Sequence, residues 1–579
     1  MLTTRRTHLA LVTLPLLVAL AHPACSATSQ PSTFGDEGGG NSATGAGGSD
    51  TITGAGGDAT IGADGGSTGG NSGRIPQSCA EALANKSYIG CEYWPTVTSN
   101  SSVFPGFQFA IAVANPTTSP AHVKVSRGAQ VASEVDVAPG ALEVVQLPWV
   151  DELKGPYGVD GAQLTSALVA GGAYHVESTM PITLYQFSPL EFQLQNPPPD
   201  CPDPALVGQC FSYTNDASLV LPTTAVGTEY YVMSYPTLHV GQKDPIFGDT
   251  SWFSSPGFVA VTATEDGTTV DVTSTANVRA GAGVGALAAG GTGKYTLNRG
   301  DVLQLETAVP SNQPAGCKDD AATGYVYCKG APADDLTGTH IASNKPVSVI
   351  AGHDCAFVPF DKFACDHLEE SLFPVEALGQ SLVVTSAASV PSLASGAPQP
   401  DSMFVRVLSA APDNQIEFEP AVHPPATLGA GQWLEIGPIT QDFRVKASNK
   451  VLVGQYMVGE NFTGDSVGAG DPSLSIAIPT EQYRLEYTFY APTTYTQNLV
   501  NVVMPAGASV TLDGQAIPDA EFLPIGATGL VVARHRIPGG THTITGSKNF
   551  GIVVYGYGSY TSYMYPGGLN LEKIVVTPK

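Results

Sequence analysis

Two short motifs bring together side chains that could bind a metal ion. HDC at 353–355 and CDH at 365–367 nearly mirror each other and supply two His, two Asp and two Cys. Two thiolates and two imidazoles suit a tetrahedral zinc site. The usual CxxC spacing is absent, however, and paired thiols oxidise in exported proteins. The sequence therefore favours a Cys355–Cys365 disulfide with polar neighbours, and we predict neither a metal nor a cofactor.

The other cysteines agree with this interpretation. Eight of the nine cysteines follow Cys25 and form four pairs that are close in sequence: Cys79 with Cys91, Cys201 with Cys210, Cys317 with Cys328, and Cys355 with Cys365. An even number in local pairs predicts disulfides formed in an oxidising compartment. Each would close a loop of roughly ten residues and stabilise the fold by about 2.5–3 kcal/mol in the chain-entropy model. We expect them to fasten loops, with the pairing inferred from proximity alone.

Two acidic segments are the next candidates for chemistry. Glu460, Asp465 and Asp471 could offer oxygen ligands to calcium. The EF-hand order is missing and such residues are common in turns, so a turn is favoured. The segment 265–267 (Glu-Asp-Gly) is interpreted as the turn of a β-hairpin.

A dense run of tyrosines lies near the C-terminal end of the chain. Aromatic rings with polar tips suit ligand binding, including stacking on sugars. Tyrosine also favours half-buried strand positions, which is the alternative interpretation. The candidate ligand-binding residues are Tyr555, Tyr557, Tyr560, Tyr563 and Tyr565.

Catalytic signatures are weak. No nucleophile elbow, HExxH helix, phosphate-binding loop or Rossmann fingerprint occurs on a suitable element. Pairs of Asp and Glu are too common in β proteins to indicate a glycosidase without geometry. We therefore predict no catalytic residues.

Four similar segments organise the chain that must position these residues. Each is predicted to be a short strand, a polar turn and a second apolar strand. They are YHVESTMPITLYQF from Tyr174, HIASNKPVSVIAG from His340, FRVKASNKVLVGQY from Phe443 and HTITGSKNFGIVVYGY from His542. Hairpin-like strand pairs precede them, from Phe109, Phe258, Phe404 and Leu499. Such repetition predicts modular β architecture.

The predicted fold class is all-β, with tandem β-sandwich-like modules. Pro374 follows Pro222 by 152 residues and Pro479 follows Pro374 by 105, which is sandwich size. A closed, propeller-like packing of sheets is the alternative, although propeller blades are usually shorter. The predicted modules cover 75–200, 201–366, 367–472 and 473–579.

The N-terminus is predicted to be an export signal. Arg5 and Arg6 precede an apolar segment at 9–20, and residues 20–25 (LAHPAC) resemble a bacterial lipobox that ends at Cys25. His22 departs from that pattern, so plain signal cleavage is the alternative. Residues 26–74 form a Gly/Ser/Ala/Thr tract that we expect to be a disordered tether, or a disordered terminus without mechanical purpose.

The charge balance of the chain restricts its possible binding partners. The chain carries 51 acidic and 25 basic residues, for a formal net charge of −26. Such a surface repels nucleic acid and anionic lipid, so we expect no nucleic-acid partner and membrane contact through a lipid anchor only.

Several long motifs resemble those of a known family. FVAVTATEDGTTVDV, LNRGDVLQL, DLTGTHIASNKPVSVIAGHDC and CDHLEESLFPVEALGQSLVVT occur in this order, followed by NVVMPAGASVTLDG. From Leu219 to Leu571 the chain resembles the N-terminal domain of the IgGFc-binding protein family, as a bacterial stand-alone version without the cysteine-dense von Willebrand D modules. The resemblance implies an extracellular binding or adhesion domain of undefined ligand. Antibody binding and catalytic residues are not carried over.

These observations together predict an exported, non-catalytic binding or adhesion protein. Its partner would be an extracellular protein or a glycan, and its location the outer membrane or cell surface as a lipoprotein, or alternatively the secreted fraction. A structural spacer or envelope component is the alternative function, followed by a carbohydrate-active enzyme. A concave, aromatic-lined pocket would favour a ligand over a spacer.

Overall fold

Four long strands, each spanning one of the four repeated segments, carry the fold. The computed structural model describes residues 73–201, 209–243, 250–309, 316–320, 324–463 and 469–576. The predicted signal peptide, Cys25 and almost all of the tether lie outside these residues. The long strands are β7 (His175–Phe187), β18 (His340–Ala356), β25 (Phe443–Met457) and β33 (Gly540–Gly558).

Each long strand is continuous where a polar turn was predicted, so that part of the prediction is wrong. In β18 the register shifts between Ala342 and Val347, and the polar residues between them are partly or fully exposed. The strand changes its neighbours at this irregularity, which bends it without ending it. One long strand therefore belongs to both halves of a curled sheet.

The prediction of hairpin-like strand pairs is also wrong, as the pairing of β12 (Gly257–Ala263) and β13 (Thr268–Thr273) shows. β12 pairs with the second half of β18, and β13 pairs with its first half, both antiparallel. The two strands therefore run in the same direction and do not pair with each other. The turn around Gly267, whose φ is +65°, carries the chain from one half of the sheet to the other.

The first and second sheets are built around β7 and β18. The order in the first is β4-β3-β7-β2-β5, and in the second β14-β13-β18-β12-β15-β6. The first sheet contains β1 (Gly90–Tyr93), β2 (Phe109–Ala114), β3 (Ala121–Arg127), β4 (Gln130–Val137), β5 (Leu142–Leu147), β7 and β8 (Ala217–Val220). The second contains β6 (Ala167–Val169), β9 (Gly227–Tyr231), β12, β13, β14 (Thr292–Leu297), β15 (Val302–Glu306), β18 and β19 (Asp366–Ser371).

The third and fourth sheets repeat this plan around β25 and β33. Their orders are β23-β22-β25-β21-β24 and β30-β29-β33-β28-β32-β31. The third contains β20 (Gly379–Val384), β21 (Met403–Ser409), β22 (Asn414–Glu419), β23 (Ala426–Leu428), β24 (Trp433–Ile439), β25 and β26 (Leu474–Ile476). The fourth contains β27 (Arg484–Ala491), β28 (Gln497–Pro505), β29 (Val510–Leu512), β30 (Gln515–Ala516), β31 (Leu523–Pro524), β32 (Leu530–Ile537), β33 and β34 (Thr561–Pro566).

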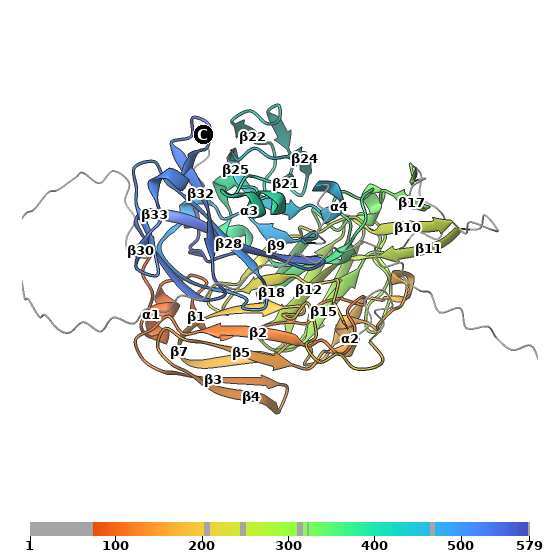
Figure 1. The fold of residues 1–579 in the computed structure, drawn as a ribbon. Helices are drawn as coiled ribbons and strands as arrows, with labels where there is room; N and C mark the ends of the chain where they lie inside the picture. Colours follow the sequence, from red (N-terminus) through yellow and green to blue (C-terminus); the bar gives the residue numbers. More distant parts are fainter. Residues whose placement is uncertain are drawn as a thin grey trace, which may run out of the picture.

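A smaller sheet is inserted into the second unit. It has the order β11-β10-β17-β16 and extends to the right in Figure 1. Its strands are β10 (Leu238–Lys243), β11 (Thr250–Ser255), β16 (Lys318–Asp320) and β17 (Tyr325–Cys328). The Cys317–Cys328 disulfide ties β17 to the residue that precedes β16.

Four inner strands bring the sheets together around a common axis. β8, β19, β26 and β34 each pair with the second half of a long strand. β8 also contacts β19 and β34, and β26 contacts the same two strands, so the contacts close a ring. The tandem sheets therefore share one body, in which the first sheet lies at the bottom of Figure 1 and the fourth at the upper left.

Helices are short and lie in the connections between strands. They are α1 (Cys79–Ala84), α2 (Asp151–Lys154), α3 (Val390–Ser395), α4 (Glu460–Thr463) and the 3-10 turns η1 (Gly161–Gln163), η2 (Pro332–Asp334), η3 (Val375–Ala377), η4 (Thr480–Gln482) and η5 (Asp519–Glu521). Among the described residues, none of these helices is long and apolar enough to cross a membrane.

One continuous apolar core runs through all four units. It begins at Tyr88 and ends at Leu571, and it includes apolar residues from strands of each of the four large sheets, whereas the inserted sheet has a small apolar cluster of its own. Alternating and continuous apolar runs in the sequence supply these residues, because successive side chains of a strand point to opposite faces. Burial of this apolar surface is the main source of stability.

Candidate functional site

A buried carboxylate joins the inner strands at the axis. Asp216 precedes β8, and its Oδ1 accepts a hydrogen bond from Ser473 Oγ at 2.6 Å. Its Oδ2 accepts from the main-chain N–H of Glu369 in β19 at 3.1 Å and of Leu474 in β26 at 3.2 Å. The N–H of Met564 in β34 lies 3.5 Å from Oδ1. One side chain thus contacts the three other inner strands.

Two further acids repeat this arrangement. Asp366 Oδ2 accepts from Thr561 Oγ1 at 2.8 Å, and its Oδ1 accepts from the N–H of Asn215 at 2.5 Å. Glu370 Oε1 accepts from Ser218 Oγ at 2.8 Å. Burial raises the pKa of Asp366 and of Glu370 well above the usual range of carboxyl groups. These acids therefore hold the inner strands together at the cost of desolvation.

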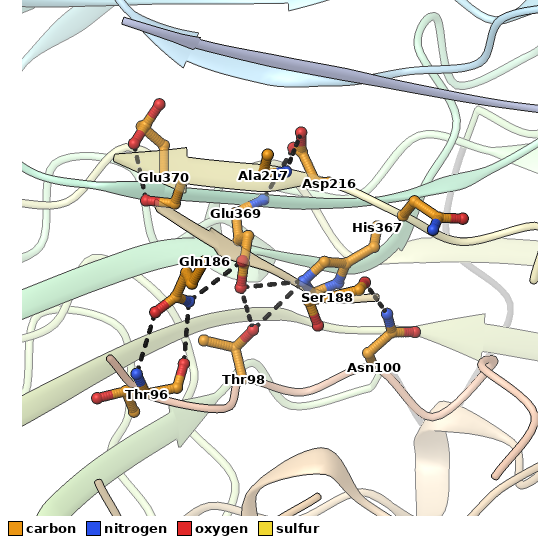
Figure 2. Close-up of polar contacts among 12 residues, drawn as sticks. Thr96, Thr98, Asn100, Gln186, Ser188, Asp216, Ala217, His367, Glu369 and Glu370 are labelled. Atoms are coloured by element: carbon orange, nitrogen blue, oxygen red, sulfur yellow. Dashed lines mark hydrogen bonds and ion pairs between the residues drawn. The ribbon is translucent and has the colours of Figure 1, made fainter. Parts of the chain in front are cut away.

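A polar network next to the axis links the first and second units (Figure 2). Gln186 Nε2 donates to the carbonyl of Thr96 at 3.0 Å and to Glu369 Oε1 at 3.1 Å. Thr98 Oγ1 donates to Glu369 Oε2 at 2.6 Å, and His367 Nε2 lies 3.5 Å from the same oxygen. Thr98, Gln186, His367 and Glu369 are all fully buried. His367 therefore has a carboxylate neighbour inside the protein.

The two histidine motifs do not meet at a metal site. Cys355 and Cys365 form a disulfide with a Cα–Cα distance of 5.2 Å. His353 Nδ1 accepts from the N–H of Cys355 at 3.2 Å, so its Nε2–H donates to the carbonyl of Pro236 at 3.0 Å. Burial lowers the pKa of His353 to about 3, which keeps the ring neutral. In the described part of the chain, no group of three or more His, Cys, Asp or Glu side chains has metal-binding geometry.

All four predicted local disulfides are confirmed. The Cα–Cα distances are 5.8 Å for Cys79–Cys91, 6.0 Å for Cys201–Cys210, 4.1 Å for Cys317–Cys328 and 5.2 Å for Cys355–Cys365. Each bond closes a loop or joins neighbouring strands, as the short spacing indicates. Cys317–Cys328 lies within the inserted sheet, and Cys365 of the last pair packs against the apolar cluster of that sheet.

A small pocket lies where the inserted sheet meets the third sheet. Its volume is about 110 Å³, and its walls come from residues 235–238, 328–330 and 357–360 and from strands β21 and β24. Four aromatic side chains line it: Tyr235, Phe357, Phe360 and Phe404. The sequence did not reveal this pocket, because its lining comes from five separate segments that carry no shared motif.

Arg406 forms the polar part of the pocket wall. Its Nη1 donates to Asp335 Oδ2 at 2.8 Å, and its Nε donates to Glu435 Oε2 at 3.0 Å. The guanidinium also stacks on the rings of Tyr235 at 4.8 Å and Trp433 at 4.3 Å. Burial alone would lower the pKa of Arg406, but Asp335, Tyr456 and Glu435 outweigh it and raise the pKa. The side chain is a fixed, permanently charged donor.

Comparison with known proteins assigns the chain to a family. A family model described as IgGFc binding protein matches residues 216–556, which is more than half of the chain. The chain belongs to the IgGFc-binding family. The IgGFc-binding protein of Homo sapiens is 28% identical over 176 residues, which cover 30% of this chain and 2% of the human protein.

The family match corresponds to a recognisable part of the architecture. It begins at Asp216 and covers β8 to β32 and β33 as far as Gly556, so β6 of the second sheet lies outside it. The pocket and the inserted sheet lie inside it. The first sheet, apart from β8, lies outside the match, yet Gln186 of β7 and Thr98 of the connection between β1 and β2 belong to the buried network. Residues outside the matched range therefore contribute to the buried network next to the axis.

Most of the predicted tyrosine site is buried in the fourth unit of this IgGFc-binding family member. Tyr555, Tyr557, Tyr563 and Tyr565 are buried, with exposed fractions of 0–4%. Tyr555 donates to Asn501 Oδ1 at 2.9 Å, and Tyr563 donates to Asn498 Oδ1 at 2.8 Å. Four of the five rings thus pack within strands and do not face a ligand, and only Tyr560 is partly exposed.

The acidic segment proposed for calcium is only partly described. Asp471 is buried, and its Oδ1 lies 3.4 Å from the N–H of Glu460 at the start of α4. Burial, with the nearby charge of Glu460, raises the pKa of Asp471. The third residue of this prediction, Asp465, lies outside the described residues.

Proposed function

We propose that this IgGFc-binding family member is an exported, non-catalytic binding or adhesion protein whose ligand enters the aromatic pocket. The pocket is the observation that carries this proposal, because concave apolar surfaces with a few fixed polar groups are typical of ligand sites. The four disulfides support export, since such bonds persist in oxidising compartments.

The residues that line the pocket favour a binding function over a structural spacer or a carbohydrate-active enzyme. A rigid spacer has no need of a pocket with a fixed arginine and four aromatic walls. Glycosidases use two carboxyl groups across the scissile bond. Glu435 is the one carboxylate among the described residues that line the pocket, which supports binding over hydrolysis.

The proposed location is the cell exterior, with Cys25 as the lipid anchor and residues 26–74 as a tether. A flexible chain of this length would place the folded body roughly 35–40 Å from the membrane on average. Mass spectrometry of the protein from intact cells should find an acylated Cys25 at the mature N-terminus. A Cys25→Ser variant should leave the membrane fraction, and an unchanged distribution would refute the anchor.

An array experiment tests the binding function directly. The purified protein is applied to glycans and extracellular proteins, including an antibody Fc fragment, beside a Phe360→Ala variant. Phe360 is a half-buried pocket wall, so its truncation should reduce specific binding at least tenfold. Tyr157→Ala is the matched control, because Tyr157 is 38% exposed and lies outside the pocket lining. Signals that are absent, or that are equal in both variants, would refute the proposed site.

A further inference from the structure

The pocket contains a buried donor that the protein itself does not use. Arg406 is 1% exposed and borders the pocket. Its Nε and Nη1 donate to Glu435, Asp335, Thr337 and the carbonyl of Ser234. Its Nη2 makes no hydrogen bond to any described residue. Because Arg406 lines the pocket, this remaining donor is available to an acceptor on a ligand, and hydrogen bonds to charged groups are among the stronger ones.

An acceptor lies beside this donor. Glu435 gives its Oε2 to Arg406, while its side chain remains 25% exposed and lines the pocket. Its Oε1 has no hydrogen bond within the described residues. Because the Nε–Oε2 bond joins this guanidinium to this carboxylate, the remaining donor and the remaining acceptor belong to neighbouring groups. Such a pair suits a ligand group that both accepts and donates, and a hydroxyl does both.

Charge and size restrict the ligand further. Arg406 and Lys329 are balanced by Asp335 and Glu435, so the immediate surroundings carry no net charge. The chain as a whole carries −26, which disfavours an anionic ligand. A volume of about 110 Å³ is well below the roughly 300–1,000 Å³ of sites for drug-sized ligands. The pocket therefore suits one small neutral ring.

We propose that this pocket binds a single neutral pyranose ring of a glycan. Adjacent hydroxyls of the sugar accept from Arg406 Nη2 and donate to Glu435 Oε1. The apolar C–H face of the ring lies on the aromatic walls, for which Phe360 is the accessible one because Tyr235, Phe357 and Phe404 are each less than 10% exposed. This inference rests on the proposed binding function and specifies its ligand.

Saturation-transfer NMR of the purified protein with free sugars tests the inference. The probes are glucose, galactose, mannose and N-acetylglucosamine, with glucuronic acid as the charged comparison and N-acetyl-tyrosine amide as the protein-like comparison. We expect transfer to the ring C–H protons of at least one neutral sugar and a weaker signal for glucuronic acid. Glu435→Ala and Phe360→Ala should each weaken binding about tenfold or more, whereas Tyr157→Ala should leave it unchanged.

The outcomes separate this inference from the broader proposal. Circular dichroism and thermal melting of each variant establish that it is folded. Transfer to the tyrosine amide alone, lost in Phe360→Ala, would overturn the sugar assignment and leave the pocket as a protein-binding site. Sugar binding that is equal in wild type, Glu435→Ala and Phe360→Ala would place the glycan elsewhere and overturn the inference. Array binding to no ligand would refute the function itself.

Discussion

Replacing Asp216 by Asn should separate the inner strands although it changes the shape of the side chain very little. Both carboxylate oxygens accept from main-chain donors: Oδ1 from the N–H of Ala217 at 2.9 Å, and Oδ2 from those of Glu369 and Leu474. An amide presents its NH₂ group to one of these sets. Whichever orientation it adopts, buried N–H donors lose their acceptor.

The expected loss follows from the number of donors. With the NH₂ at the Oδ2 position, two buried N–H groups are left without partners. Each such group costs about 1–3 kcal/mol, so the variant should lose roughly 2–6 kcal/mol of unfolding free energy. That is a large part of the roughly 5–15 kcal/mol that native domains have.

Urea unfolding followed by tryptophan fluorescence measures this loss. Asp136→Asn is the control, because Asp136 has an 82% exposed side chain, and its unfolding free energy should change by less than about 0.5 kcal/mol. An Asp216→Asn midpoint as close to wild type as that of the control would refute the reasoning. Two unfolding transitions in the variant, where wild type has one, would show in addition that the sheets no longer unfold cooperatively.

Three more predictions concern the same body. Burial raises the pKa of Glu370 above its unfolded value near 4.3, so its contribution to stability is complete below about pH 4 and is lost as pH rises. Wild type should therefore unfold at a lower urea concentration at pH 8 than at pH 5. Glu370→Gln should reduce the change of unfolding free energy with pH by up to about 1.4 kcal/mol per pH unit. An unchanged slope would contradict this. Replacing both Cys355 and Cys365 by Ser should lower the unfolding free energy by about 2.5–3 kcal/mol in urea titrations, with no loss if the chain-entropy account fails here. Arg406→Met should cost about 3–5 kcal/mol by leaving the buried carboxylate of Asp335 unpaired, and the double variant with Asp335→Leu should recover part of that loss in thermal melts.

Local features of the fold could be predicted from the sequence. The four repeated segments each contain one long strand, because their alternating and continuous apolar runs are typical of strands. The disulfides were predictable because each pair is 9–12 residues apart. The IgGFc-binding family was recognisable because its motifs recur in order.

Long-range features could not be predicted in the same way. Turn residues such as Gly267 indicate a turn, but they do not reveal whether the flanking strands pair with each other or with a third strand. The ring depends on contacts across great sequence distances, such as Asp216 with Ser473, 257 residues apart. No periodic pattern encodes such a contact. The pocket was missed for the same reason, since Tyr235, Phe360 and Arg406 come together only in the folded body.

The strands that complete the first three sheets come late in the sequence of each sheet, and this determines where the chain can be cut. β8 completes the first sheet although it follows that unit in sequence, and β19 and β26 do the same for the second and third sheets. A fragment cut to the family match would end at Gly556, before β34, and would leave β33 with an uncovered edge. Exposed edges of this kind invite aggregation. Soluble truncations should therefore end beyond Pro566, and insertions should be tolerated best in the outer loops.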